Sequence, residues 1–213
     1  MMKSMFGKTV GALCGALALA ATLPAGPASA AVYTFDDLGP LIQPIGAYHG
    51  LDFNNFDSLA PSAYPWMATT GYAHGVVSQK DIAFNDNGGP ASITDPGGHF
   101  SLISAFFTSA YLNGLKLEIK GLDNGVVKFT KTLFLDTSNP TKVVFNWAGI
   151  DAVKFVSSYC GCSDKGRQFV MDNLTIMTGV PEPSTWALMM MGFGGVGVMI
   201  RSTRRRDQAR AAA

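Results

Sequence analysis

The feature that most constrains the fold is a strict alternation of apolar and charged residues in the middle of the chain. From Leu115 to Lys120 the sequence reads L-K-L-E-I-K, so every second side chain is apolar. Because a strand projects successive side chains to opposite faces, this period predicts a half-buried β-strand. The segment that follows contains Asn124-Gly125, a dipeptide typical of two-residue hairpin turns. The pattern therefore predicts an antiparallel hairpin with one buried face.

Short segments of the same kind recur through residues 31–179, separated by Gly, Asn, Asp and Pro. We recognise no convincing amphipathic helix between them. The expected strands are 32–35, 51–53, 75–78, 81–84, 100–105, 115–120, 126–135, 141–147, 152–157 and 169–177. About ten strands in roughly 150 residues predict an all-β domain, an antiparallel β-sandwich of jelly-roll type. An immunoglobulin-like sandwich is the alternative, although it would contain fewer strands.

The first 30 residues have the three parts of a secretory signal peptide. Lys3 and Lys8 give a basic start, residues 10–23 are apolar, and residues 28–30 form the small-residue site Ala-Ser-Ala. We therefore expect an N-terminal signal helix in residues 1–30 that signal peptidase removes. The remaining domain would then be one ordinary domain of about 150 residues.

The carboxyl end combines three parts in residues 180–206. Pro181-Glu182-Pro183 comes first, an uncharged and mostly apolar run follows over residues 186–200, and an arginine cluster comes last. At about 1.5 Å per residue this run is about a turn shorter than a full membrane span. We expect a short C-terminal transmembrane helix that acts as a temporary stop. The arginines and the tail 207–213 would lie on the cytoplasmic side.

In the order of its parts this tail resembles the PEP-CTERM sorting signal of Gram-negative bacteria. The matching residues are Pro181, Glu182, Pro183, Trp186, Ala187, Gly192, Phe193, Gly194, Arg204, Arg205 and Arg206. The resemblance implies processing by an exosortase, a membrane protease-transpeptidase, and a producer of exopolysaccharide. It implies transient residence in the inner membrane and then release to the cell surface or extracellular matrix. Residues 31–179 also resemble many uncharacterised ectodomains that carry such a tail.

The charge of the mature domain limits its partners. The whole chain has a net charge of +1, but residues 31–180 contain 9 Lys and Arg against 13 Asp and Glu, a net charge of about −4. A mildly acidic domain argues against nucleic acid as a partner.

Asp172 is the most informative single residue of the domain. On the last expected strand it shares a face with Val170, Leu174 and Ile176, and an ionised carboxylate on an apolar face is costly unless it is paired or binds a metal. The first and last strands of a jelly roll often lie close together, so Asp36 and Asp37 could approach it. Three carboxylates would suit a structural calcium ion. The alternative is that Asp172 faces outward or accepts backbone N–H bonds in a turn.

The aromatic group Tyr64, Trp66 and Tyr72 is a candidate sugar-binding surface, since sugars stack on aromatic faces. The alternative is that these rings pack in the core or against loops.

Cys160 and Cys162 remain after removal of the signal peptide and could form a disulfide in an oxidising compartment. A ring closed over a single Gly would be strained.

We find no catalytic motif, no metal-ligand spacing of His, and no nucleotide-binding loop. The leading hypothesis is therefore a non-catalytic, exported protein with a structural or adhesive role in exopolysaccharide or biofilm. The first alternative is a carbohydrate-binding module with a structural calcium, and the second is a hydrolase.

Overall fold

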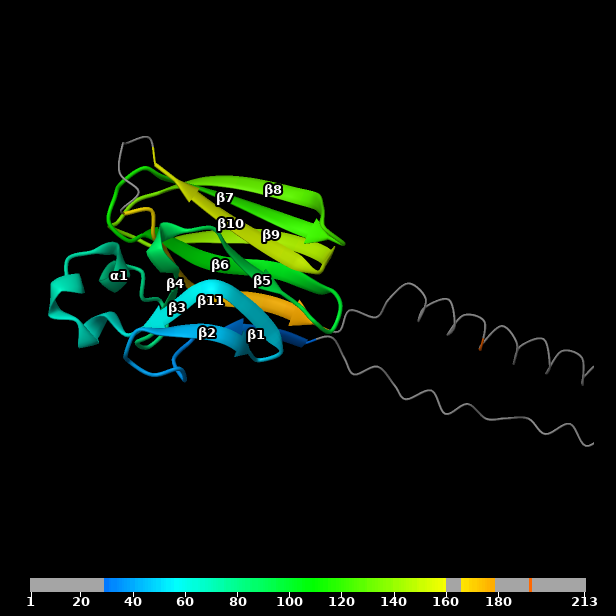
Figure 1. Ribbon diagram of the computed structural model, residues 1–213, viewed down its shortest axis with the longest axis horizontal. Coiled ribbons are helices and arrows are strands. Elements are labelled where there is room, and N and C mark those ends of the chain that lie inside the picture. The colour runs from blue at the N-terminus through cyan, green and yellow to red at the C-terminus, as the bar shows by residue number, and fades with distance from the viewer. Residues whose placement is uncertain (1–28, 160–165, 179–191, 193–213) are drawn as a thin grey trace, which may run out of the picture.

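The computed structural model describes residues 29–159, 166–178 and Gly192, and these residues form an all-β domain (Figure 1). Its strands are β1 (Ser29–Tyr33), β2 (Gln43–Tyr48), β3 (Leu51–Leu59), β4 (Ile82–Asn85), β5 (Ala91–Thr94), β6 (Phe100–Ser109), β7 (Leu115–Asp123), β8 (Val126–Leu135), β9 (Thr141–Ile150), β10 (Ala152–Ser158) and β11 (Phe169–Thr178). The short helices between them are η1 (Pro61–Ala63), η2 (Pro65–Met67), α1 (Gly71–His74) and η3 (Asp86–Gly88). Every strand pairing is antiparallel. The predicted antiparallel all-β fold is therefore confirmed.

No helix in the described part of the chain is long and apolar enough to cross a membrane. The expected signal helix and the expected transmembrane helix lie outside the described residues.

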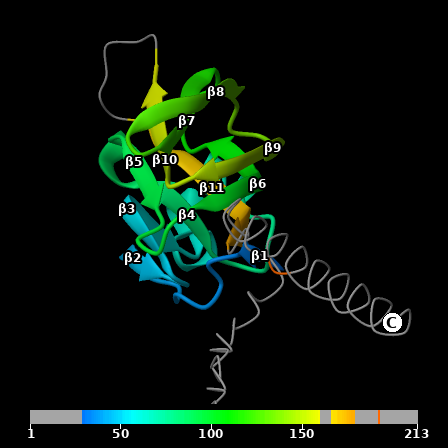
Figure 2. The same cartoon turned by 90° about the vertical axis from the view of Figure 1, so that its right-hand side faces the viewer.

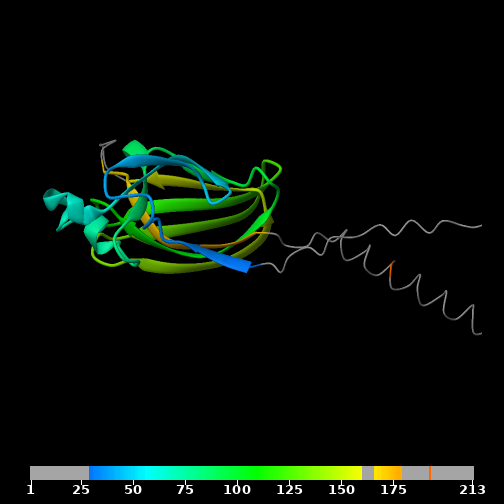
Figure 3. The ribbon, with the colours of Figure 1, turned by 90° about the horizontal axis from the view of Figure 1, so that it is seen from below.

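The strands follow one path, β8-β7-β10-β5-β3-β4-β11-β6-β9, with β1 added on β11 and β2 on β3. The path curls until its two ends approach, so the strands surround a common interior (Figures 2 and 3). Between β8 and β9 the Lys131 ammonium donates to the Val144 carbonyl at 3.5 Å. The rings of Phe129 and Trp147 stack there at 5.3 Å between centroids. The result is a sandwich close to a closed barrel, with edges bridged by side chains.

Aromatic rings fill much of the interior. Phe56, Phe107, Phe155 and Phe169 are fully buried and meet edge-to-face, tilted or stacked at 5.5–6.2 Å. Burial of such side chains is the main favourable term in folding, about 25 cal/mol per Å² of apolar surface. The alternation that predicted β7 places Leu115, Leu117 and Ile119 in this core.

The expected hairpin turn is confirmed. Asn124 and Gly125 join β7 to β8 with φ values of 50° and 77°, the left-handed conformation that a two-residue turn of this kind requires.

Two parts of the strand prediction are wrong. Residues 75–78 form no strand, because the N–H groups of Val77 and Ser78 bind the Asp172 carboxylate instead of a neighbouring strand. Two short strands, β2 and β5, were missed. β2 contains Pro44 and pairs with β3 through an irregular register at Gly46, so its sequence gives only a weak strand signal.

A small lobe of residues 61–75, made of η1, η2 and α1, packs on one end of the sandwich (Figure 1). It has its own core, which contains Leu59, Met67, Tyr72, Ile82, Phe84, Ala110 and Val170. The Gly71 N–H donates to the Ala110 carbonyl at 2.9 Å, and the Ala110 N–H donates to the Gln168 carbonyl at 3.0 Å. The lobe is therefore anchored just before β11 begins.

The chain enters and leaves the domain at the other end. Ser29 of β1 pairs with Thr178 of β11, so these two residues lie side by side. The ten residues of β11 separate Thr178 from the lobe by roughly 30 Å. We call the end with the lobe the distal end. Cleavage after Ala30 stays a prediction, and it would leave the pairs of residues 31–33 with β11 in place.

We predict that Gly71→Ala detaches the lobe. A Cβ at Gly71 would lie 1.7 Å from the Ser109 carbonyl oxygen, and the backbone there cannot move without breaking the Gly71–Ala110 hydrogen bond. The free energy of unfolding should fall by about 2–3 kcal/mol, measured by urea denaturation. Ser62→Ala, an exposed change in the same lobe, should alter it by less than about 0.5 kcal/mol. Equal effects of the two changes would contradict this role of Gly71.

Candidate functional site: the aromatic distal end and the aspartate loop

Trp66 is the most exposed tryptophan of the described residues, with 57% of its surface accessible. It lies in η2, a single turn that Pro65 begins. Tyr64 is half-buried beside it, with ring centroids 6.2 Å apart. The Tyr64 hydroxyl accepts a hydrogen bond from the Ile42 N–H at 2.9 Å. Trp66 therefore projects outward from a support that Tyr64 fixes.

Tyr72 does not join this pair. It is 2% exposed and packs edge-to-face on Phe84 at 5.3 Å and on Tyr111 at 5.4 Å. Burial raises the pKa of its hydroxyl far above the ordinary value, and Tyr111 adds to the effect. Tyr72 thus belongs to the core of the lobe and supports Tyr111, which is 41% exposed. Of the expected sugar-binding set, the structure brings only Tyr64 and Trp66 together at the surface.

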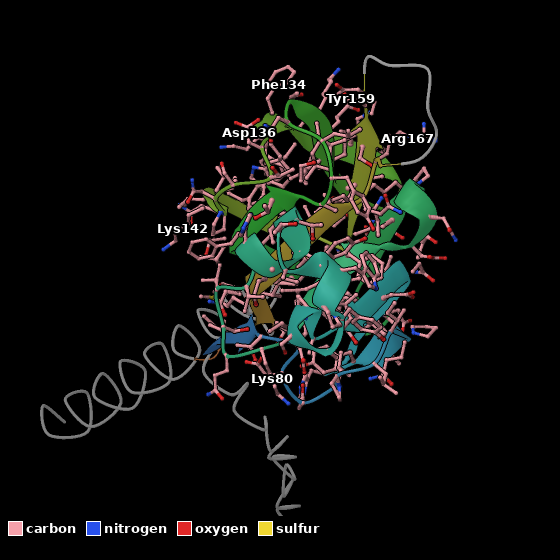
Figure 4. All side chains as sticks on the ribbon, turned by 90° about the vertical axis from the view of Figure 1, so that its left-hand side faces the viewer. Lys80, Phe134, Asp136, Lys142, Tyr159 and Arg167 are labelled. Atoms are coloured by element: carbon pink, nitrogen blue, oxygen red, sulfur yellow. The ribbon has the colours of Figure 1, made fainter. Side chains whose placement is uncertain are left out.

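Three further exposed aromatic residues lie at the distal end, and the sequence analysis did not single them out. They are Tyr111, Phe134 and Tyr159, with exposures of 41%, 73% and 38%. Phe134 and Tyr159 lie at the same edge of the domain when it is viewed from the distal end (Figure 4). Both are close to Lys116 of β7, which pairs with Phe134 on one side and with Ser158 on the other.

All four exposed aromatic side chains of the described residues thus lie at the end opposite to Ser29 and Thr178. A sequence signal for one of them existed: in β8 the alternation buries Leu135 and so turns Phe134 outward. Tyr111 and Tyr159 lie in irregular segments just after the ends of β6 and β10. Hydrophobic periodicity does not predict there whether a side chain faces the core or the solvent.

A second cluster surrounds Asp172, which is fully buried on β11. Its Oδ2 accepts hydrogen bonds from the N–H groups of Val77 and Ser78, both at 2.7 Å. Its Oδ1 accepts from the Asn173 N–H at 2.6 Å. Burial raises the pKa of Asp172 despite these bonds, which lower it. The carboxylate therefore fixes residues 77–81, which we call the aspartate loop, against β11.

The expected position of Asp172 is partly wrong. It lies on the side of Val170, which packs in the core of the lobe, whereas Leu174 and Ile176 belong to the main core. The reason is a bulge between Asp172 and Thr175, where Asn173 has a φ of 48°. One extra residue in a strand reverses the alternation beyond it.

Asp36 joins this cluster from the segment after β1, as the expected contact between first and last strands implies. Its Oδ1 accepts from the N–H groups of Lys80 and Asp81, both at 2.9 Å. The Ser78 hydroxyl lies 3.3 Å from this oxygen and 3.0 Å from Oδ2 of Asp172. Burial pushes the pKa of Asp36 upward, but three backbone N–H groups and the hydroxyl together hold it below the ordinary value.

Asp81 is a buried carboxylate that the sequence analysis missed. Neither of its oxygens makes a hydrogen bond of ordinary geometry within the described residues, and the Lys80 ammonium lies 3.6 Å from Oδ2. Burial raises the pKa of Asp81. The charge of Asp36 adds to the rise, while Lys80 and the nearby Gly39 N–H oppose it. A single Asp after Ser78, Gln79 and Lys80 reads as an exposed loop residue in the sequence, so its burial beside Asp36 could not be predicted.

Asp37 lies apart from the aspartate loop. It accepts a hydrogen bond from the Tyr48 hydroxyl and faces the His49 ring nitrogen at 3.3 Å. These contacts, led by that from Tyr48, lower the pKa of Asp37. The three aspartates expected to share a calcium ion are therefore not gathered at one point.

Within the described residues, no group of three or more His, Cys, Asp or Glu side chains is arranged to hold a metal ion. Asp36 and Asp172 meet at Ser78, but backbone N–H groups already bind both. Asp172 thus accepts backbone N–H bonds, as the alternative to a calcium site proposed. Calcium binding stays a prediction.

The remaining predicted sites cannot be placed. Cys160 and Cys162 lie outside the described residues, and so do the motif residues Pro181, Glu182, Pro183, Trp186, Arg204, Arg205 and Arg206.

We predict opposite effects of two changes, one in Asp36, which binds the aspartate loop, and one in Asp81, which belongs to it. Asp36→Asn removes a charged acceptor of several N–H bonds and should lower the free energy of unfolding by about 1–3 kcal/mol near neutral pH. Because the folded pKa of Asp36 is lowered, its stabilisation is present above the unfolded pKa and is lost as the pH falls through the folded value. The deficit of the variant should therefore shrink in acid.

Asp81→Asn is the matched control, a change within the loop whose N–H groups donate to Asp36. The raised folded pKa of Asp81 means that its ionised form costs stability as the pH rises above the unfolded value. This variant should therefore be at least as stable as the natural protein near neutral pH. Urea denaturation between about pH 3 and pH 7 measures both, and a loss of stability in both variants of the same size and pH dependence would contradict the assignment.

Comparisons with known proteins give one match in sequence and several in structure. No curated protein sequence matches the chain. The fold is similar to the K1 cleaved adhesin domain of Lys-gingipain from Porphyromonas gingivalis W83, with a TM-score of 0.41, 9% identity, and coverage of 70% of this chain and 97% of that one. It is also similar to CBM51 from Clostridium perfringens GH95 in complex with methyl-galactose, with a TM-score of 0.34, 13% identity, and coverage of 70% and 92%. Residues 179–206 match the model of the PEP-CTERM protein-sorting motif, so the chain carries the sorting signal of an exported, exosortase-processed protein.

Proposed function

We propose that the chain is a non-catalytic protein of the cell surface or extracellular matrix, with a structural or adhesive role in exopolysaccharide. One observation carries the proposal: the sorting motif begins directly after β11, at the end of the domain opposite to its exposed aromatic side chains. A chain held or processed at residues 179–206 presents the distal end outward. This polarity suits a domain that contacts a polymer beyond its own attachment point.

Exopolysaccharide binding at the distal end is the finer form of this proposal. Trp66 offers an exposed indole on a fixed support, and Tyr111, Phe134 and Tyr159 extend the aromatic surface. Aromatic faces pack on the apolar faces of sugar rings, while indole N–H and hydroxyl groups find polar partners. The carbohydrate-binding alternative with a structural calcium uses the same surface and adds a metal near Asp36 and Asp172.

The sorting step predicts a processing defect. Replacement of Pro181, Glu182 and Pro183 by Ala removes the residues that an exosortase would recognise, so the chain should accumulate unprocessed in the inner-membrane fraction. Immunoblots of membrane, surface and medium fractions measure the distribution. Thr203→Ser is the matched control within the motif region and should not change it. Normal release of the triple variant would contradict recognition at these residues.

The aromatic surface predicts a loss of polysaccharide binding. Trp66→Ala should weaken binding to exopolysaccharide isolated from the producing cells by about two- to ten-fold, since aromatic contacts contribute about 0.5–1.5 kcal/mol each. Trp66→Phe should retain part of the affinity. Val32→Ala changes an exposed apolar residue at the opposite end and should have no effect. Equal binding by all three variants would exclude this surface.

The same titration in the presence of a chelator separates the two forms of the proposal. A structural calcium ion would stabilise the folded state, so its removal should lower both the melting temperature and the affinity. The structural or adhesive form without a metal predicts no change in either quantity.

A further inference from the structure

The outer face of β7 and β10 carries three lysines, Lys116, Lys120 and Lys154, which we call the lysine face. Lys120 and Lys154 are directly opposite in the register of the two strands, and like charges in that position destabilise a sheet. Lys120 contacts Glu118. The ion pairs found among the described residues include neither Lys116 nor Lys154. Lys116 and Lys154 therefore make no ion-pair contact among the described residues, although the charge of Lys116 acts on the Glu118 carboxylate between Lys116 and Lys120.

The lysine face stands out because the rest of the domain is acidic. Residues 36–86 contain six Asp and one Lys, a net charge of −5. Residues 115–158 contain six Lys and four Asp or Glu, a net charge of +2. Lys128, by contrast, is paired with Asp123 at 3.4 Å. Lys131 and Lys142 also form no ion pair among the described residues, so the distinguishing feature of the lysine face is that three lysines gather there around a single carboxylate, Glu118.

Polar and apolar groups suited to a sugar chain flank these lysines. The strand register places Ser92 of β5 beside Lys154 and Thr130 of β8 beside Lys120. At the distal end of the face Lys116 lies opposite Phe134, which is 73% exposed. The lysine face therefore continues into the aromatic distal end.

We propose that the lysine face binds an anionic polysaccharide, a glycan with carboxylate or sulfate groups spaced along its chain. Lys116 and Lys120 are four residues apart on one strand, a separation of roughly 13 Å. Such sparse charge suits a polymer whose anions are separated by sugar units. Duplex DNA carries one charge per roughly 1.7 Å of axis, and the acidic remainder of the domain repels so dense a polyanion. The inference rests on the proposed polysaccharide binding and specifies its substrate class.

The test uses the full chain in a nonionic detergent, titrated with polygalacturonate as the anionic glycan and with dextran as the neutral one. Lys116→Gln/Lys154→Gln should weaken binding to polygalacturonate by at least about ten-fold at low salt, and the difference should shrink as salt screens the charges. Lys80→Gln/Lys142→Gln is the matched control: it also removes two positive charges, from the loop before β4 and from β9, neither of which contributes to the lysine face. It should change the affinity by less than about two-fold. Circular dichroism checks that each variant is folded.

The outcomes separate this inference from the proposed function. Equal weakening by the two double variants, or no weakening by either, overturns the lysine face while Trp66-dependent binding to exopolysaccharide still stands. Absence of binding to any glycan, including isolated exopolysaccharide, overturns the proposed function as well. Tighter and equally lysine-dependent binding to duplex DNA or to vesicles of anionic phospholipid overturns the assignment to a polysaccharide.

Discussion

The buried carboxylate of Asp172 connects the parts on which the rest of the structure depends. It lies on β11, which pairs with β1, β4 and β6, at the bulge where the strand passes from the core of the lobe to the main core. Its hydrogen bonds to Val77 and Ser78 hold the loop that leads from the lobe to β4. A buried charge is tolerated only when such bonds satisfy it. One side chain thus fixes the lobe, the loop and the central strand relative to one another.

The lobe and the sorting motif consequently lie at opposite ends of the domain. The lobe is anchored before the first residue of β11, and the sorting motif follows directly after its last. The length of a single strand therefore separates the exposed Trp66 from the site of processing. Rigidity along that strand matters, because a binding surface held by a continuous sheet keeps its orientation to the attachment point, whereas one joined by a flexible linker would not.

Most of the fold could be predicted from periodicity, and the site could be predicted only in part. The alternation from Leu115 to Lys120 fixes one strand and the Asn124-Gly125 turn fixes the next, because both signals are local. The bulge at Asn173 is not visible in the sequence, so the face of Asp172 was assigned wrongly beyond it. Burial of Tyr72 and convergence of Asp81 with Asp36 depend on contacts between segments far apart in the chain. No local pattern encodes such contacts.

The sheet places two like charges, Lys120 and Lys154, directly opposite each other on neighbouring strands. Exposed like charges cost little at physiological salt, because water and ions screen them. Burial of the aromatic core therefore stabilises the folded sandwich by more than the repulsion between these two lysines destabilises it. Glu118 already offsets the charge of Lys120, and a polyanion bound beside Lys154 would offset the remaining repulsion and stabilise the folded state by mass action. A domain that is weakly strained when free and relieved when bound would be more stable within an anionic matrix than in solution.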